Sequence, residues 1–95
     1  MTVMTYLSDV QAGGGTAFPA IGVKSEAENG AALLWVNLKT AGQKDRLTLH
    51  GGCPVLVGSK WITNKWIRFN DQFAKFRCTL DLHEQIDFYD HYKTY

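Results

Sequence analysis

Closely spaced glycines and prolines divide this chain into short apolar segments, and their spacing limits the folds that it can adopt. Nine glycines and two prolines lie among 95 residues. The segments between them are rich in β-branched and aromatic residues and predict strands. These candidate strands comprise residues 2–10, 16–18, 31–38, 47–50, 54–57 and 60–69. Many short strands separated by glycine and proline predict a mainly β fold, either a barrel or a jelly roll.

The predicted connections are polar or glycine-rich. They comprise residues 12–15, 22–30 with a tight turn at Asn29-Gly30, and 40–46. Residues 31–38, AALLWVNL, form a continuous apolar run that suits either a strand buried on both faces or a short buried helix, and periodicity does not separate the two. From about Gln72 the pattern becomes helical or irregular. We therefore expect one domain over residues 1–80 and a tail over 81–95.

The overall charge and hydropathy exclude several classes of partner. The formal net charge is +1, which gives no electrostatic case for nucleic acid. No apolar run approaches the roughly 20 residues that span a bilayer. The N-terminal MTVMTYLSD has neither a basic region nor a long apolar region, so we expect no signal peptide.

The segment KWITNKWIRF at 60–69 carries unusual patterning for a strand. Alternation of side chains places Lys60, Ile62, Asn64 and Trp66 on one face. Neither face is uniformly apolar, whereas a simple two-layer sandwich has one apolar and one polar face. This pattern favours a barrel with a polar-lined pocket.

Several side chains could carry chemistry, and each also has an ordinary structural interpretation. His50 precedes a Gly-Gly turn, where an imidazole could bind a metal or could simply be hydrogen-bonded at a strand end. Lys60 could bind a carboxylate or could be solvated. Thr16 follows three glycines and could satisfy local backbone groups. Trp35 and Trp66 could pack in the core or line a ligand site.

The tail offers a second, weaker metal hypothesis. His83, Asp87 and His91 recur at four-residue spacing and would share one face of a helix, as metal ligands can. Polar tails also produce such spacings by chance.

Three runs of residues resemble one known family. They are YLSDVQAGGGTAFP at 6–19, LLWVNL at 33–38 and HGGCPVLVGSKWITNKW at 50–66. Together they are similar to the C-terminal part of the catalytic domain of collagen-type prolyl 4-hydroxylase alpha subunits. This family consists of Fe(II)- and 2-oxoglutarate-dependent dioxygenases. The resemblance implies a partial double-stranded β-helix, or jelly-roll barrel, that lacks its N-terminal strands.

The resemblance implies roles for individual residues. His50 occupies the place of the distal iron ligand, Lys60 that of the lysine pairing with the far carboxylate of 2-oxoglutarate, and Thr16 that of a threonine beside this cosubstrate. Trp66 matches a tryptophan that lines the active site, which Asn64 and Trp35 would also line. The implied cofactors are Fe(II), 2-oxoglutarate and ascorbate, because a facial triad leaves iron positions open for the 2-oxo acid and oxygen.

The resemblance also implies a disulfide and a cellular context. Cys53 and Cys78 match family cysteines that are linked to each other, and such a bond persists in the endoplasmic reticulum lumen. The implied substrate is peptidyl-proline in collagen-like chains, and the implied partner is protein disulfide isomerase as the beta subunit.

The chain departs from the family pattern at the iron site. The family takes its first two iron ligands from a His-x-Asp motif, and this motif is absent from the sequence. Leu49 stands where the family has an arginine before the distal histidine. We therefore expect little or no hydroxylase activity from this chain alone. A non-catalytic short paralogue, acting as a binding module, is the alternative.

Overall fold

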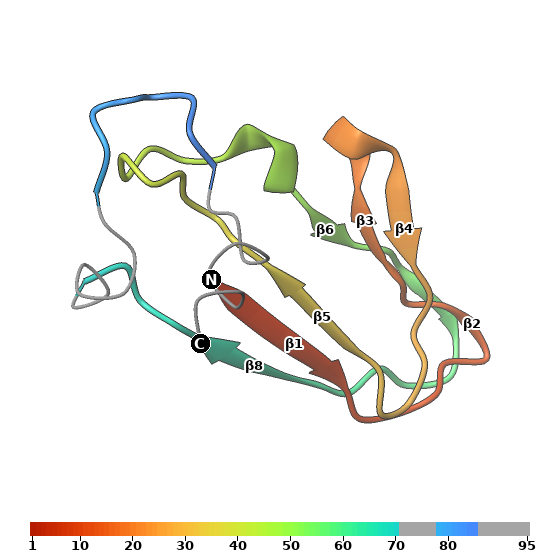
Figure 1. Ribbon diagram of the computed structural model, residues 1–95. Helices are drawn as coiled ribbons and strands as arrows, with labels where there is room; N and C mark the ends of the chain where they lie inside the picture. The colour runs from red at the N-terminus through yellow and green to blue at the C-terminus, as the bar shows by residue number, and fades with distance from the viewer. Residues whose placement is uncertain (71–77, 86–95) are drawn as a thin grey trace.

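The computed structural model describes residues 1–70 and 78–85 and consists mainly of antiparallel strands (Figure 1). In the first three-stranded sheet, β1 (Thr2–Tyr6) lies between β5 (Ala32–Trp35) and β8 (Ile62–Trp66). The register pairs Thr2 with both Trp35 and Trp66. The prediction of a mainly β fold is confirmed.

A second three-stranded sheet contains β3 (Thr16–Phe18) between β4 (Val23–Ser25) and β6 (Gly51–Gly52). A separate strand pair joins β2 (Ala12–Gly13) to β7 (Val55–Val57). The described strands do not close into a barrel, and the arrangement is that of a partial jelly roll.

The core lies between the two three-stranded sheets. Along β1 the burial alternates strictly, and the buried side chains are those of Thr2, Met4 and Tyr6. Across the core, the Phe18 ring of β3 packs edge-on against the Trp35 ring of β5, with a centroid distance of 5.4 Å. The two sheets therefore face each other, and the space between them receives the inner side chains of both.

The close contact between β2 and the residues at the start of β7 depends on glycine. Gly13 has φ of 80° and Gly14 has φ of 74°, a left-handed conformation that side chains disfavour. A Cβ atom on Gly13 would also collide with the Pro54 carbonyl oxygen. This close approach brings the chain preceding Thr16 against the segment that follows His50.

Several predicted boundaries need correction. Residues 47–50, expected to be extended, overlap a 3₁₀ helix, η2 (Arg46–Thr48), because the Asp45 carboxylate accepts a hydrogen bond of 3.1 Å from the Leu47 amide and caps the turn. The predicted loop at 22–30 contains β4, which forms by pairing with β3. A second 3₁₀ helix, η1 (Pro19–Ile21), connects β3 to β4.

The apolar run at 31–38 forms a strand and not a helix, but only one of its faces is buried. Leu34 is 57% exposed, because β5 is an edge strand whose outer face has no covering layer in the described part of the chain. The tight turn at Asn29-Gly30 is confirmed, with φ of 85° at Gly30. No helix among the described residues is long and apolar enough to cross a membrane.

Candidate functional site

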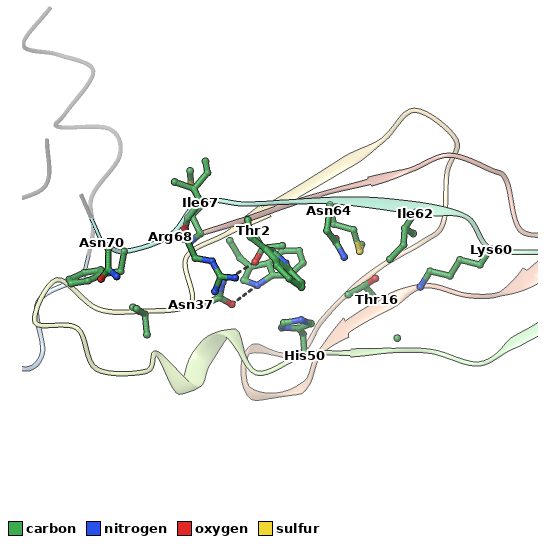
Figure 2. A pocket seen from close by; sticks show the side chains of 17 residues that line it. Thr2, Thr16, Asn37, His50, Lys60, Ile62, Asn64, Ile67, Arg68 and Asn70 are labelled. Atoms are coloured by element: carbon green, nitrogen blue, oxygen red, sulfur yellow. Dashed lines mark hydrogen bonds between the residues drawn. The ribbon is translucent and has the colours of Figure 1, made fainter. Parts of the chain in front are cut away.

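A pocket of about 780 Å³ opens between the two three-stranded sheets (Figure 2). One wall comes from β8 and from Lys60, two residues before it, and the side chains of this wall are those of Lys60, Ile62, Asn64 and Trp66. These four residues are the ones that the alternation of the sequence places on one face. Figure 2 shows Asn64, Ile62 and Lys60 extending into the space that Thr16 and His50 border from the other sheet.

Lys60 places a positive charge at one end of this pocket. Its side chain is half-buried, and its ammonium nitrogen lies 3.5 Å from the Gly15 carbonyl oxygen and 5.6 Å from the centre of the Tyr6 ring. An ammonium group has three N–H donors and no acceptor. The carbonyl engages one donor weakly, so the others remain free to bind an anionic group in the pocket.

A buried hydroxyl pair lies beside this ammonium group. The Tyr6 hydroxyl and the Thr16 Oγ1 atom are 2.8 Å apart, and Tyr6 is fully buried. Sequence reasoning identified Thr16 and missed Tyr6. The signal that could have found Tyr6 is the alternation of β1, which directs the side chains of Thr2, Met4 and Tyr6 inward.

Gly52 leaves open space between these groups. The strand register places it opposite Thr16, and a Cβ atom built on it would lie 3.6 Å from the Lys60 ammonium nitrogen. This end of the pocket is therefore lined by one cation, the Thr16 hydroxyl and a glycine, a combination that suits the carboxylate end of a small ligand, and the buried Tyr6 hydroxyl lies behind Thr16.

His50 lies farther along the same pocket, at the residue before β6. Its Nδ1 atom is 2.8 Å from the Thr48 carbonyl oxygen. A carbonyl only accepts, so Nδ1 donates this hydrogen bond and leaves Nε2 as the nitrogen available to a metal. The imidazole packs against Trp35 at 4.6 Å and Phe18 at 5.5 Å between ring centroids. A histidine oriented in this way by a backbone carbonyl is suited to metal binding through its other nitrogen.

Asn37, a second polar residue that sequence reasoning missed, holds the Trp35 ring against which His50 packs. The Asn37 Oδ1 atom accepts a hydrogen bond of 2.8 Å from the Trp35 indole, and its Nδ2 atom donates one of 2.9 Å to the Thr2 hydroxyl. Trp35 is only 8% exposed, so this chain of hydrogen bonds fixes a buried indole against the imidazole. The sequence gives no pattern that separates Asn37 from an ordinary loop asparagine.

The opposite end of the pocket is open and aromatic. Trp66 is 62% exposed, and the Arg68 guanidinium lies 5.7 Å from its ring centre. Trp66, Asn64 and Trp35 all line the pocket, and the buried Trp35 ring also packs against His50. The structure thus gathers all six predicted pocket residues around one space.

Comparison with known proteins gives a consistent family. Human prolyl 4-hydroxylase subunit alpha-1 is 46% identical to this chain over 79 residues, or 83% of the chain. Human subunit alpha-3 is 49% identical over 78 residues, or 82% of the chain, and chicken (Gallus gallus) subunit alpha-2 is 49% identical over 65 residues, or 68%. The chain belongs to the prolyl 4-hydroxylase alpha-subunit family.

The similarity covers most of this chain but a small part of each relative. The matched residues amount to 15% of human alpha-1, 14% of human alpha-3 and 12% of chicken alpha-2. No protein-family profile matches the chain. Family membership therefore does not by itself assign to this chain the activity of a whole alpha subunit.

The described side chains near His50 do not provide the ligands of the iron that this family implies. His50 offers one nitrogen, and no group of three His, Cys, Asp or Glu side chains occurs within residues 1–70 and 78–85. One imidazole is not the set of three ligands that a facial triad requires. The described residues therefore do not fit a complete iron site. The second metal hypothesis involved His83, Asp87 and His91. His83 is exposed, and Asp87 and His91 lie outside the described residues.

The two cysteines are separate thiols in this structure, with Cys53 half-buried and Cys78 exposed. The Cys53 amide donates a hydrogen bond of 2.8 Å to the Gly15 carbonyl oxygen, which also faces the Lys60 ammonium group. Cys53 is therefore held next to the pocket by its backbone. The Cys53–Cys78 disulfide stays a prediction that rests on the family resemblance.

Proposed function

We propose that this chain provides the 2-oxoglutarate anchor and one iron ligand of an Fe(II)- and 2-oxoglutarate-dependent prolyl 4-hydroxylase. The observation that carries the proposal is the placement of the Lys60 ammonium group and the His50 imidazole along one pocket. A dicarboxylate binds with its far carboxylate at Lys60 and Thr16, and its 2-oxo acid end extends toward His50. Charge-assisted hydrogen bonds from an ammonium group are about twice as strong as neutral ones, so Lys60 supplies most of the anchoring.

The residues of this chain then divide the work by position. Lys60 and Thr16 hold the cosubstrate, the buried Tyr6 hydroxyl orients Thr16 through their hydrogen bond, and His50 would offer one nitrogen to a metal. Iron would supply the activation of oxygen for hydroxylation only where further ligands completed the set to which His50 contributes. The Trp66 end of the pocket, which is open and aromatic, receives the substrate, for which we propose peptidyl-proline in collagen-like chains. Ascorbate as a cofactor, protein disulfide isomerase as a partner and the endoplasmic reticulum lumen as the location are proposed from the family alone.

The chain alone is proposed to be inactive as a hydroxylase. The sequence contains no His-x-Asp motif, so His50 is left without the two partners that the family uses. This same observation favours a second candidate function, a non-catalytic module that binds 2-oxoglutarate or a proline-rich peptide. A peptide of (Pro-Pro-Gly) repeats, incubated with the chain, Fe(II), 2-oxoglutarate and ascorbate, should show no mass increase. A gain of one oxygen per hydroxylated proline would contradict the proposed inactivity.

The binding half of the proposal has its own test. Ligand-observed NMR measures the affinity of the chain for 2-oxoglutarate, and Lys60→Ala should weaken it about tenfold or more through loss of the charged partner. Lys65→Ala is the matched control, because Lys65 projects from the other face of β8 and does not line the pocket. Equal affinities of the Lys60 and Lys65 variants would refute the anchor.

A further inference from the structure

The start of the segment that carries Lys60 is held by a side chain from another strand. The register of β1 and β8 ends with Tyr6 opposite Ile62, and the Leu7 amide then donates a hydrogen bond of 2.8 Å to the Trp61 carbonyl oxygen. Beyond that point the backbone of the first strand turns away. The contact between the two segments is continued by the hydroxyl group of Ser8 and no longer by the backbone.

The Ser8 hydroxyl makes two hydrogen bonds of opposite sense. It donates to the Ser59 carbonyl oxygen at 3.0 Å and accepts from the Trp61 amide at 2.9 Å. Extending the strand register by two residues places Ser8 opposite Lys60. One hydroxyl group therefore bridges the residues immediately before and after the lysine and fixes the backbone on both sides of it.

Lys60 depends on this backbone more than an ordinary lysine does. Its side chain is long and flexible, and among the described residues its ammonium group is oriented by a 3.5 Å contact to the Gly15 carbonyl oxygen and by the Tyr6 ring. A flexible side chain with a weakly held end is placed mainly by the position of its Cα atom. Preorganisation of this kind determines how much of the charge interaction a ligand gains.

We propose that Ser8 is a positioning residue for the Lys60 anchor, an inference that rests on the proposed binding of 2-oxoglutarate. Ser8 lies outside the pocket and is not among its lining residues, so it acts on the ligand only through Lys60. The Ser-Asp-Val run that contains it gains a physical role, namely to replace the strand pairing where the first strand departs.

The test compares variants of the full chain for 2-oxoglutarate affinity by ligand-observed NMR. Ser8→Ala should weaken binding about three- to tenfold, as expected for loss of one to two exposed hydrogen bonds. Ser8→Thr keeps the hydroxyl and should restore most of the affinity. Ser59→Ala is the matched control, because it removes a neighbouring hydroxyl while keeping the carbonyl that Ser8 binds, and it should leave the affinity unchanged.

A double-mutant cycle separates positioning from general destabilisation. If Ser8 acts through Lys60, Ser8→Ala should weaken binding in the unaltered chain and should have no further effect in the Lys60→Ala background. Equal losses in the two backgrounds, or no loss in either, would overturn the proposal. Hydrogen exchange at the Trp61 amide provides a ligand-free readout, because Ser8→Ala should accelerate it, and an unchanged rate would also overturn the proposal.

The proposed function fails in a different way. If the unaltered chain binds no 2-oxoglutarate, the anchor itself is wrong and the role of Ser8 falls with it. If the unaltered chain binds and depends on Lys60 but not on Ser8, the anchor stands and the positioning role alone is overturned.

Discussion

Replacing Tyr6 with Phe removes a single hydroxyl from the most deeply buried large side chain of the core. The Tyr6 hydroxyl forms a 2.8 Å hydrogen bond with Thr16 Oγ1, and both residues are buried. Removing one partner of a buried hydrogen bond leaves the other unpaired, which costs about 1–3 kcal/mol. We therefore expect Tyr6→Phe to lower the free energy of unfolding by about 1–3 kcal/mol.

Thr16→Val should have a similar effect, because it leaves the Tyr6 hydroxyl unpaired. The double variant removes both polar groups, so its loss should fall short of the sum of the single losses by about 1 kcal/mol. Urea unfolding followed by circular dichroism measures all three, and a loss of 1 kcal/mol corresponds to a decrease of about 4–8 °C in Tm for a chain of this size.

The matched control for the threonine change is Thr63→Val, on the exposed outer face of β8. It should change stability by less than about 0.5 kcal/mol, as surface substitutions usually do. Losses for Tyr6→Phe and Thr16→Val that add fully in the double variant would show that the two hydroxyls do not interact. That result would remove the pair as a preformed part of the ligand site.

Three further changes test other parts of the structure. Asn37→Ala interrupts the hydrogen-bond chain behind the pocket and should cost about 1–3 kcal/mol in urea unfolding, whereas a loss below about 0.5 kcal/mol would contradict a structural role. Gly13→Ala should lower Tm clearly more than Gly30→Ala does. Both glycines have positive φ, but of the two only Gly13 would place a Cβ atom against a backbone carbonyl oxygen. Equal Tm values for the two variants would refute this close approach. Oxidation should join Cys53 to Cys78, lower the mass by two hydrogens and stabilise the chain by roughly 3 kcal/mol, and a reductant-insensitive Tm would contradict the disulfide.

Local patterns in the sequence were sufficient to predict the wall of the pocket. Alternation along residues 60–69 placed Lys60, Asn64 and Trp66 on one face, because side-chain direction in a strand depends only on the spacing of residues. The composition of residues 16–18 predicted β3 with its observed bounds. These features are local, so one chain segment contains all the information that they need.

Features that arise from contacts between distant segments could not be predicted in this way. The strand β4 exists through its pairing with β3, and the outer face of β5 is exposed because no layer covers it. Tyr6, Asn37 and Ser8 owe their roles to partners that lie 10, 35 and about 50 positions away in the chain. Their importance becomes visible only once the strands are placed side by side.

The ligand groups of the pocket belong to different sheets. Thr16 lies on β3 of the second sheet, whereas Lys60 lies two residues before β8, which pairs with β1 of the first sheet. A dicarboxylate bound by both would act as a non-covalent cross-link between the two layers. Cosubstrate concentration then becomes a thermodynamic variable of folding, and a ligand at one hundred times its dissociation constant would add about 2.7 kcal/mol to the stability of the chain.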